Sequence, residues 1–152
     1  MTNSLIKLAK VGCLSRDVKL YDEGGKQVRL SSGLFGVAGR YQLTKAGKIV
    51  VPAGSSTFFA RNPRTLAGRT ADGTIVLATI DGRQTTSVGA TLAETARVAQ
   101  ALGVVDAVNL DGGGSTTLSV RGALANQPSG SSGGRAVGDA LVYIEGPLRK
   151  GS

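Results

Sequence analysis

The stretch that decides the fold is Val104-Val-Asp-Ala-Val-Asn-Leu-Asp-Gly-Gly-Gly-Ser-Thr116. Apolar residues alternate with Asn109 and Asp111, as they do in a strand whose two faces meet different surroundings. Three consecutive glycines follow, although glycine loses more backbone entropy on ordering than any other residue. A ligand that approaches the main chain closely would explain that cost. The stretch therefore predicts a binding site at the end of a strand, built from a carboxylate, an amide and bare N–H groups.

A second strand is predicted to end in the same way, since a β-rich run stops at Asp81. Between the two strands, apolar spacing predicts a helix over 91–102, in which Thr91 and Glu94 have the spacing of an N-terminal capping box. A strand, a helix and a strand in this order form a crossover between parallel strands. We therefore expect Asp81 and Asp111 at one edge of a sheet, on strands about 5 Å apart if they are direct neighbours.

Simpler roles are open for these residues. The dipeptide Asp-Gly often marks a turn, so Asp111 could brace its glycine loop and Asp81 could belong to an ordinary β-turn. Asn109 could satisfy buried backbone groups. The three glycines after Asp111 favour a functional role for that residue, and the predicted crossover extends this interpretation to Asp81.

The fold class predicted for the chain is α+β. We expect a mixed, strand-rich, twisted sheet with hairpins and at least one βαβ crossover, whose helix is the one at 91–102. One domain suits a chain of 152 residues. Strands are expected at 17–22, 27–32, 41–44, 48–51, 56–61, 65–70, 74–80, 105–110, 116–120 and 139–145.

Composition excludes several classes of function. The chain has no histidine and one cysteine, which excludes a Ser-His-Asp or Cys-His hydrolase and argues against a zinc site. Carboxylates must therefore supply any acid–base chemistry. The net charge is +8, but the basic residues are scattered and only six residues are aromatic, so we expect no nucleic-acid partner. No apolar stretch has the length that a membrane span requires.

Four segments occur in a specific order: Arg61-Asn-Pro-Arg-Thr-Leu-Ala-Gly68, Ile80-Asp-Gly-Arg83, Thr91-Leu-Ala-Glu94 and Asn109-Leu-Asp-Gly-Gly-Gly-Ser-Thr116. Together they resemble the phosphodiester glycosidase family. Segments at 126–130, 135–137 and 139–142 resemble the part with which the family's domain closes, and the resemblance covers roughly 38–145. The family includes the enzyme that uncovers mannose 6-phosphate by removing N-acetylglucosamine, and many bacterial exopolysaccharide-associated proteins.

The resemblance implies a hydrolase that cleaves the bond between a sugar and the phosphate of a glycosyl phosphodiester of the N-acetylglucosamine-1-phosphodiester type, or of a polysaccharide. We expect Asp111 to activate water or attack the anomeric carbon, and Asp81 to support the oxocarbenium-like centre. Magnesium or calcium bridging Asp81, Asp111 and the phosphate is a variant of this mechanism. The expected substrate-binding residues are Arg64, Arg83, Asn109, Gly112, Gly113, Gly114, Ser115, Thr116 and Arg135.

The resemblance also suggests how the chain is organised. Residues 38–146 are expected to form the phosphodiester glycosidase-like core, and 147–152 a mobile tail. Residues 1–37 are read as a segment of short strands that lacks the Asn-Gly-Gly-Phe-Phe or Asn-Gly-Gly-Tyr-Phe sequence usual upstream in the family. The alternative function is therefore a catalytically inactive module that binds glycans or sugar phosphates within a larger envelope or assembly protein. The family favours a location outside the cytoplasm, and the sequence predicts no oligomeric state.

Overall fold

The computed structural model describes residues 19–22, 24–29, 36–130, 134–138 and 140–143. The chain divides into two units, Met1–Gly36 and Val37–Ser152. In the first unit, β1 (Leu20–Tyr21) and β2 (Gln27–Val28) pair as an antiparallel hairpin. The expected tail at 147–152 and much of the segment 1–37 lie outside the described residues.

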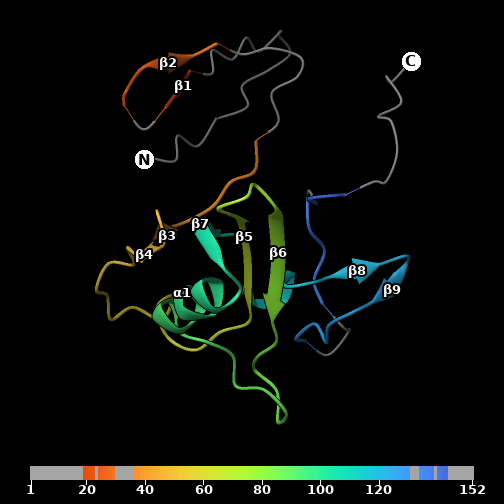
Figure 1. Cartoon of the computed structure of the whole chain (residues 1–152). Coiled ribbons are helices and arrows are strands. Elements are labelled where there is room, and N and C mark those ends of the chain that lie inside the picture. Colours follow the sequence, from red (N-terminus) through yellow and green to blue (C-terminus); the bar gives the residue numbers. More distant parts are fainter. Residues whose placement is uncertain (1–18, 23, 30–35, 131–133, 139, 144–152) are drawn as a thin grey trace, which may run out of the picture. The chain divides into compact units, whose positions relative to one another are not determined.

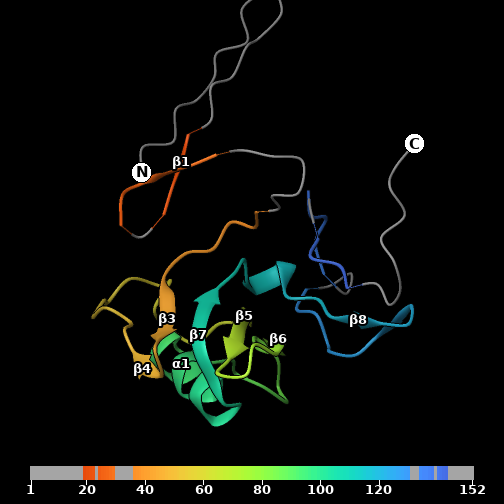
Figure 2. The ribbon, with the colours of Figure 1, turned by 45° about the horizontal axis from the view of Figure 1, so that its top comes forward.

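A five-stranded sheet forms the centre of the second unit, in the strand order β4-β3-β7-β5-β6 (Figure 2). Every neighbouring pair of strands is antiparallel. A separate antiparallel hairpin of β8 and β9 follows the sheet in the chain. The strands are β3 (Gln42–Lys45), β4 (Lys48–Ile49), β5 (Arg64–Thr70), β6 (Ile75–Ile80), β7 (Val104–Asn109), β8 (Ser119–Val120) and β9 (Ala123–Leu124).

The helix α1 (Leu92–Ala101) packs on one face of this sheet (Figure 1). Thr91 caps its N-terminus: the Thr91 hydroxyl accepts from the backbone N–H of Glu94 (3.1 Å), and the Glu94 carboxylate accepts from the backbone N–H of Thr91 (2.8 Å). The predicted helix and its capping box are thus confirmed. Its apolar face completes the hydrophobic core, which consists of Leu43, Leu66, Leu92, Ala96, Ala99, Val104 and Ala107.

The sheet differs from the expected mixed sheet in one respect that matters for the site. β6 and β7 are not neighbours, because β5 lies between them and pairs with both. Since both are antiparallel to β5, they run in the same direction, but their axes are about 10 Å apart rather than one strand spacing. The combination of a strand-rich sheet with one helix among the described residues is consistent with the α+β class.

Two expected strands are absent from the described residues. Residues 56–61 form a turn, in which the N–H of Phe59 donates to the carbonyl of Ser56 (2.9 Å), and carbonyls of this segment are used by a buried arginine described below. Of the strand expected at 139–145, residues 140–143 are not in a strand, and the other three lie outside the described residues. The strand expected at 116–120 is confined to β8, because the N–H of Thr116 donates back to the carbonyl of Gly113 (3.1 Å) in a 3-10 turn and the N–H of Leu118 donates to the side chain of Asn126 (2.7 Å).

The glycine turn that follows β7 packs against the start of β5. The N–H of Leu110 donates to the carbonyl of Thr65 (2.9 Å), and the N–H of Gly113 donates to the carbonyl of Pro63 (2.9 Å). A Cβ atom on Gly112 would lie only 2.7 Å from that Pro63 oxygen. Glycine is required here because no larger residue fits between the two backbones.

We expect Thr91→Ala to lower the free energy of unfolding by about 1 kcal/mol, because the first turn of α1 would lose its side-chain cap. Urea unfolding followed by circular dichroism measures the change. Thr85→Ala, at an exposed threonine of the loop between β6 and α1, is the control and should change stability by less than about 0.5 kcal/mol. Equal effects of the two variants would contradict the capping role.

The glycine turn offers a matched pair of substitutions. Gly112→Ala should destabilise the fold by about 1–3 kcal/mol, because its Cβ meets the backbone of Pro63. Gly114→Ala should be tolerated, since its Cβ would lie 3.6 Å from the side chain of Arg135, an ordinary contact. Thermal unfolding of the two variants tests this, and a stable Gly112→Ala protein would contradict the close packing of the turn.

Candidate functional site

A cavity of about 690 Å³ opens where β7 ends and β5 begins. This volume lies within the range of sites for small ligands. The lining combines glycines, arginines, two residues of the turn at 56–61 and the polar residues at the end of β7. The lining residues are Ala38, Gly39, Arg40, Thr57, Phe58, Asn62, Pro63, Arg64, Arg83, Asn109, Leu110, Asp111, Gly112 and Gly113.

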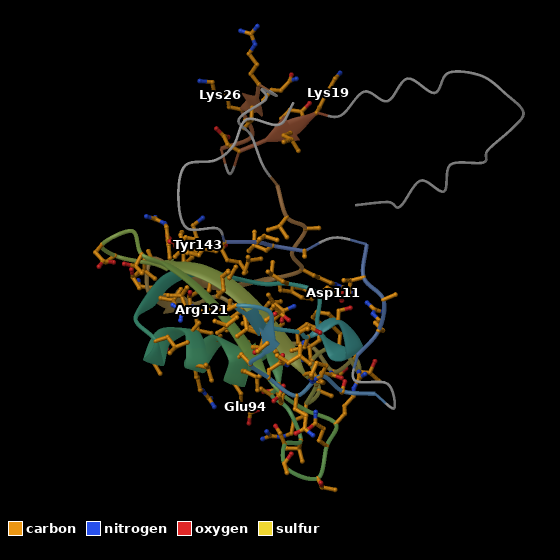
Figure 3. The ribbon with its side chains drawn as sticks, turned by 90° about the vertical axis from the view of Figure 1, so that its right-hand side faces the viewer. Lys19, Lys26, Glu94, Asp111, Arg121 and Tyr143 are labelled. Atoms are coloured by element: carbon orange, nitrogen blue, oxygen red, sulfur yellow. The ribbon has the colours of Figure 1, made fainter. Side chains whose placement is uncertain are left out.

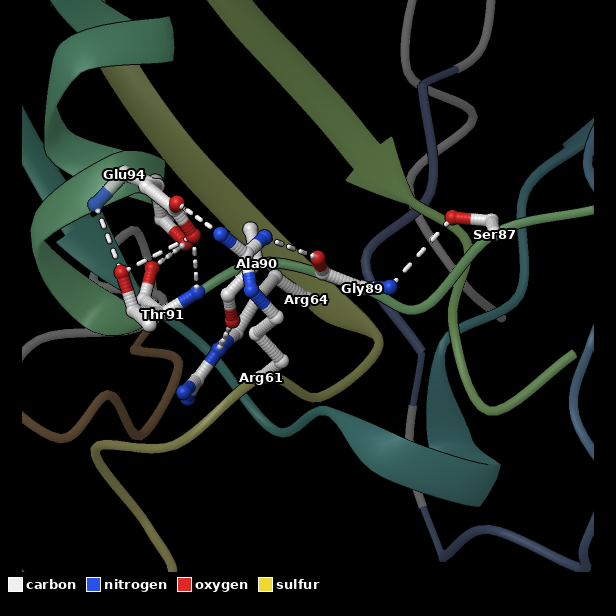
Figure 4. A network of polar contacts seen from close by, with 8 residues as sticks. Arg61, Arg64, Ser87, Gly89, Ala90, Thr91 and Glu94 are labelled. Carbon is white, nitrogen blue, oxygen red and sulfur yellow. Dashed lines mark hydrogen bonds and ion pairs between the residues drawn. The ribbon is translucent and has the colours of Figure 1, made fainter.

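Arg64, the first residue of β5, is a buried cation at the base of this cavity. Only 3% of its surface is exposed. Its Nε donates to the carbonyl of Ala90 (3.0 Å), and its Nη2 donates to the carbonyls of Phe58 (2.6 Å) and Ala60 (2.8 Å); Figure 4 shows the contact with Ala90. Burial lowers the pKa of Arg64, and the positive charge of Arg83 lowers it further. Neither cause is a neighbouring carboxylate.

Two further arginines line the cavity. The Nη2 of Arg83 donates to the Oδ1 of Asn62 (2.7 Å), and a Cβ on Gly113 would lie 3.4 Å from Arg83 Nη1. The Arg40 guanidinium lies 4.8 Å from the centre of the Phe58 ring. Ion pairs between described residues involve other arginines, and none joins these three to a carboxylate. The cavity therefore has an excess of positive charge and suits an anion.

Asp111 is the carboxylate that lines this cavity, and its lowered pKa keeps it ionised at neutral pH. Its position is labelled in Figure 3. Its Oδ1 accepts from the N–H of Gly112 (2.9 Å), and its Oδ2 accepts from Nη2 of Arg135 (2.7 Å). A side-chain hydrogen bond with Ser115 is the largest cause that lowers the pKa of Asp111, and the hydrogen bond and charge of Arg135 add to it. The side chain is 70% exposed, so a ligand in the cavity can reach it.

Asn109 is the last residue of β7, and one of its polar atoms has no partner. The side chain is buried, with 1% of the residue exposed. Its Nδ2 donates to the carbonyl of Leu110 (2.9 Å), but no described residue donates to its Oδ1. An unpaired buried acceptor is unfavourable by about 1–3 kcal/mol. A hydroxyl or N–H group of a ligand could satisfy this oxygen, since Asn109 lines the cavity.

Asp81 lies at the end of β6 but does not line the cavity. Its carboxylate accepts from Nδ2 of Asn126 (2.8 Å) and from the backbone N–H of Gln127 (2.9 Å). The Oδ1 of Asn126 in turn accepts from the N–H of Leu118 (2.7 Å). These contacts favour a positioning role for Asp81, which holds the segment after β9, and its expected catalytic role stays a prediction.

The remaining expected binding residues surround Asp111 without lining the cavity. Arg135 donates from Nε to Oγ of Ser115 (2.7 Å). Both residues also form hydrogen bonds with Asp111, which lines the cavity. Thr116 is buried, and its hydroxyl accepts from that of Thr65 (3.4 Å). The backbone carbonyl of Gly114 accepts from the N–H of Arg135 (3.1 Å). Contact of these residues with a ligand stays a prediction.

The glycines contribute less hydrogen bonding to the cavity than we expected. The N–H of Gly112 donates to Asp111, and the N–H of Gly113 donates to Pro63. Both groups are thus engaged with acceptors of the protein, and the arginines are the charged donors that line the cavity. A magnesium or calcium site stays a prediction too, and among the described residues no three acidic, histidine or cysteine side chains gather.

Among the lining residues with a charged or amide side chain, Arg40 and Asn62 did not emerge as candidates from the sequence. Asn62 belongs to the Arg61–Gly68 segment, so the motif itself could have indicated it. Phe58 reaches the cavity because residues 56–61 turn instead of forming a strand. Arg40 carries no signal in the sequence, because its position depends on an unusual backbone conformation at the next residue.

The sequence matches the phosphodiester glycosidase family over residues 10–144. The SPbeta prophage-derived protein YomE of Bacillus subtilis is 38% identical over 82 residues, which are 54% of this chain and 13% of YomE. N-acetylglucosamine-1-phosphodiester alpha-N-acetylglucosaminidase of Bos taurus is 46% identical over 66 residues, which are 43% of this chain and 12% of the bovine protein. The chain thus spans about an eighth of the length of these curated relatives.

Solved structures are similar as well. A Burkholderia pseudomallei protein named "Putative exported protein" is 56% identical with a TM-score of 0.50, over 51% of this chain and 15% of that one. The zebrafish N-acetylglucosamine-1-phosphodiester alpha-N-acetylglucosaminidase catalytic domain is 28% identical with a TM-score of 0.53, over 71% of this chain and 38% of that one.

None of the helices in the described part of the chain is long and apolar enough to cross a membrane. Three of the four motifs that carried the resemblance contribute residues to one cavity, which Arg64, Arg83, Asn109 and Asp111 line. The fourth, Thr91–Glu94, caps α1 instead. With a family match over most of its length, the chain belongs to the phosphodiester glycosidase family.

Proposed function

We propose that this chain hydrolyses the bond between the anomeric carbon of a sugar and the phosphate of a glycosyl phosphodiester of the N-acetylglucosamine-1-phosphodiester type. The observation that carries the proposal is a cavity with three arginines that no described carboxylate neutralises, beside one ionised aspartate. The bovine and mouse relatives are named for this activity. A location outside the cytoplasm belongs to the same proposal, and the name of the Burkholderia protein supports it.

Arg64 and Arg83 would bind the phosphate. Guanidinium groups match phosphate oxygens in geometry and charge, and Arg64 and Arg83 lie on the same cavity as Asp111. Their charge stabilises the negative charge that grows on the phosphate oxygen as its bond to the sugar breaks. The Oδ1 of Asn109 would accept a hydrogen bond from a sugar hydroxyl or N-acetyl N–H group, which removes its unsatisfied state.

Asp111 would act on the anomeric carbon. Its lowered pKa keeps it ionised at neutral pH, so it can accept a proton or attack carbon but cannot donate a proton. In the direct version, the water oxygen bonds to the anomeric carbon and gives a proton to Asp111. The bond from that carbon to the phosphate oxygen breaks, and its electron pair leaves with the phosphomonoester. A phosphate leaving group is stable as an anion, so the reaction needs no general acid there.

Asp111→Asn should reduce turnover by about 10²–10⁴-fold, since it removes the ionised group from the cavity. Asp106→Asn is the matched control, because Asp106 is an aspartate of β7 paired with Arg69 (2.7 Å) and does not line the cavity. Release of sugar from an N-acetylglucosaminyl or glucosyl phosphodiester, with added magnesium or calcium and with a chelator, measures the activity.

Wild-type turnover in a folded Asp111→Asn protein would contradict the proposed role of Asp111. A wild-type chain that binds a sugar phosphate but releases no sugar in any of these conditions would instead be the inactive binding module.

The pH profile tests the environment of Asp111. Because its pKa is lowered, the carboxylate stays ionised as the pH falls, and kcat/KM should decline only below the usual range of an aspartate. Ser115→Ala removes the largest cause of this shift, so the acidic limb of kcat/KM should move to higher pH. Ser119→Ala, at an exposed serine of β8, should leave the limb unchanged. Circular dichroism over the same pH range defines where each variant is folded, and an unmoved limb in folded Ser115→Ala would contradict the assignment.

A further inference from the structure

An unusual backbone conformation at the next residue, Tyr41, positions Arg40 at the cavity. Tyr41 has a φ angle of +69°, in the left-handed region that a bulky side chain rarely adopts. Two backbone hydrogen bonds support this conformation: the N–H of Arg40 donates to the carbonyl of Asn109 (2.8 Å), and the N–H of Asn109 donates to the carbonyl of Tyr41 (3.0 Å). Arg40 is therefore tied to the same residue that carries the unpaired cavity acceptor.

Aromatic rings orient the Arg40 guanidinium. Its central carbon lies 4.8 Å from the centre of the Phe58 ring and 5.3 Å from that of Tyr41. These rings pack together, with centres 5.4 Å apart. Stacking on rings uses the face of a guanidinium and leaves its N–H edges available. No described residue makes an ion pair or side-chain hydrogen bond with Arg40, so its donors are free to meet a ligand in the cavity that it lines.

The three positive charges of the cavity arginines exceed the negative charge of one phosphodiester. A phosphodiester carries a single negative charge, and Arg64 and Arg83 already oppose it with two positive charges. Asp111 does not neutralise Arg40, because its carboxylate is paired with Arg135. Arg40, the third arginine of the cavity, therefore has no anionic partner even when the proposed substrate is bound.

We propose that Arg40 is a specificity-determining residue that binds a second phosphate group close to the scissile phosphodiester. The substrate class would be glycosyl phosphodiesters that carry another phosphate, either as a substituent of the sugar or as the next linkage of a phosphate-containing polymer. The cavity volume of about 690 Å³ leaves room beyond one sugar phosphate. This inference rests on the proposed function, since it places the scissile phosphate at Arg64 and Arg83.

Binding of two simple sugar phosphates tests the role of Arg40 separately from the proposed function. Glucose 1-phosphate presents one phosphate, and glucose 1,6-bisphosphate presents two. For the wild-type chain we expect the bisphosphate to bind about tenfold more tightly by isothermal titration calorimetry, with an advantage that falls as salt is added. Arg40→Gln should remove this advantage and leave the affinity for glucose 1-phosphate unchanged. Arg97→Gln, at an exposed arginine of α1, should leave both affinities unchanged.

The outcomes are distinguishable. Equal binding of the two probes by the wild-type chain, or equal loss of both in Arg40→Gln, would overturn the role of Arg40 while leaving the proposed function intact. Failure of both probes to bind would overturn both proposals. Arg40→Lys guards against a folding defect, because it keeps the charge and should retain part of the advantage. Turnover of a polymer of phosphodiester-linked sugars is then compared with turnover of a glycosyl phosphodiester whose single sugar carries a phosphate substituent. The better substrate identifies the source of the second phosphate.

Discussion

The burial of the Arg64 guanidinium is the constraint on which the rest of the site depends. A cation removed from water must recover its lost hydration from other polar groups. The carbonyls of Phe58, Ala60 and Ala90 do so, and this requirement turns residues 56–61 and brings the loop before α1 against the start of β5. Carbonyl dipoles solvate the cation without neutralising it. The charge of Arg64 therefore remains available to an anion in the cavity.

The glycine turn solves a second problem, which is to bring the end of β7 against the start of β5. Only a residue without a side chain fits beside the Pro63 carbonyl at Gly112. The same turn sets Asp111 beside Ser115 and Arg135, whose contacts keep the carboxylate ionised. Arg135, which does not line the cavity, forms the ion pair with Asp111. The three arginines that line the cavity therefore keep their positive charge beside an ionised aspartate.

Much of the fold could be predicted because it depends on local patterns. The helix over Leu92–Ala101 follows from its apolar spacing and its capping box, and the strands β5, β6 and β7 follow from β-rich runs between turn residues. Pairing between strands could not be predicted, since it depends on contacts distant in sequence. β5 therefore lies between β6 and β7, which separates the ends of those strands and leaves Asp81 to hold Asn126.

For the site, the sequence by itself determined which chemistry is available: carboxylates and arginines without histidine, and a glycine turn at the end of a strand. It also indicated Arg64, Arg83, Asn109 and Asp111, because these residues belong to contiguous motifs. Only the tertiary structure decided that they share a cavity with Arg40 and that Asp81 does not line it. The physical reason is that burial, backbone strain and strand order arise from packing between distant segments, which no local pattern encodes.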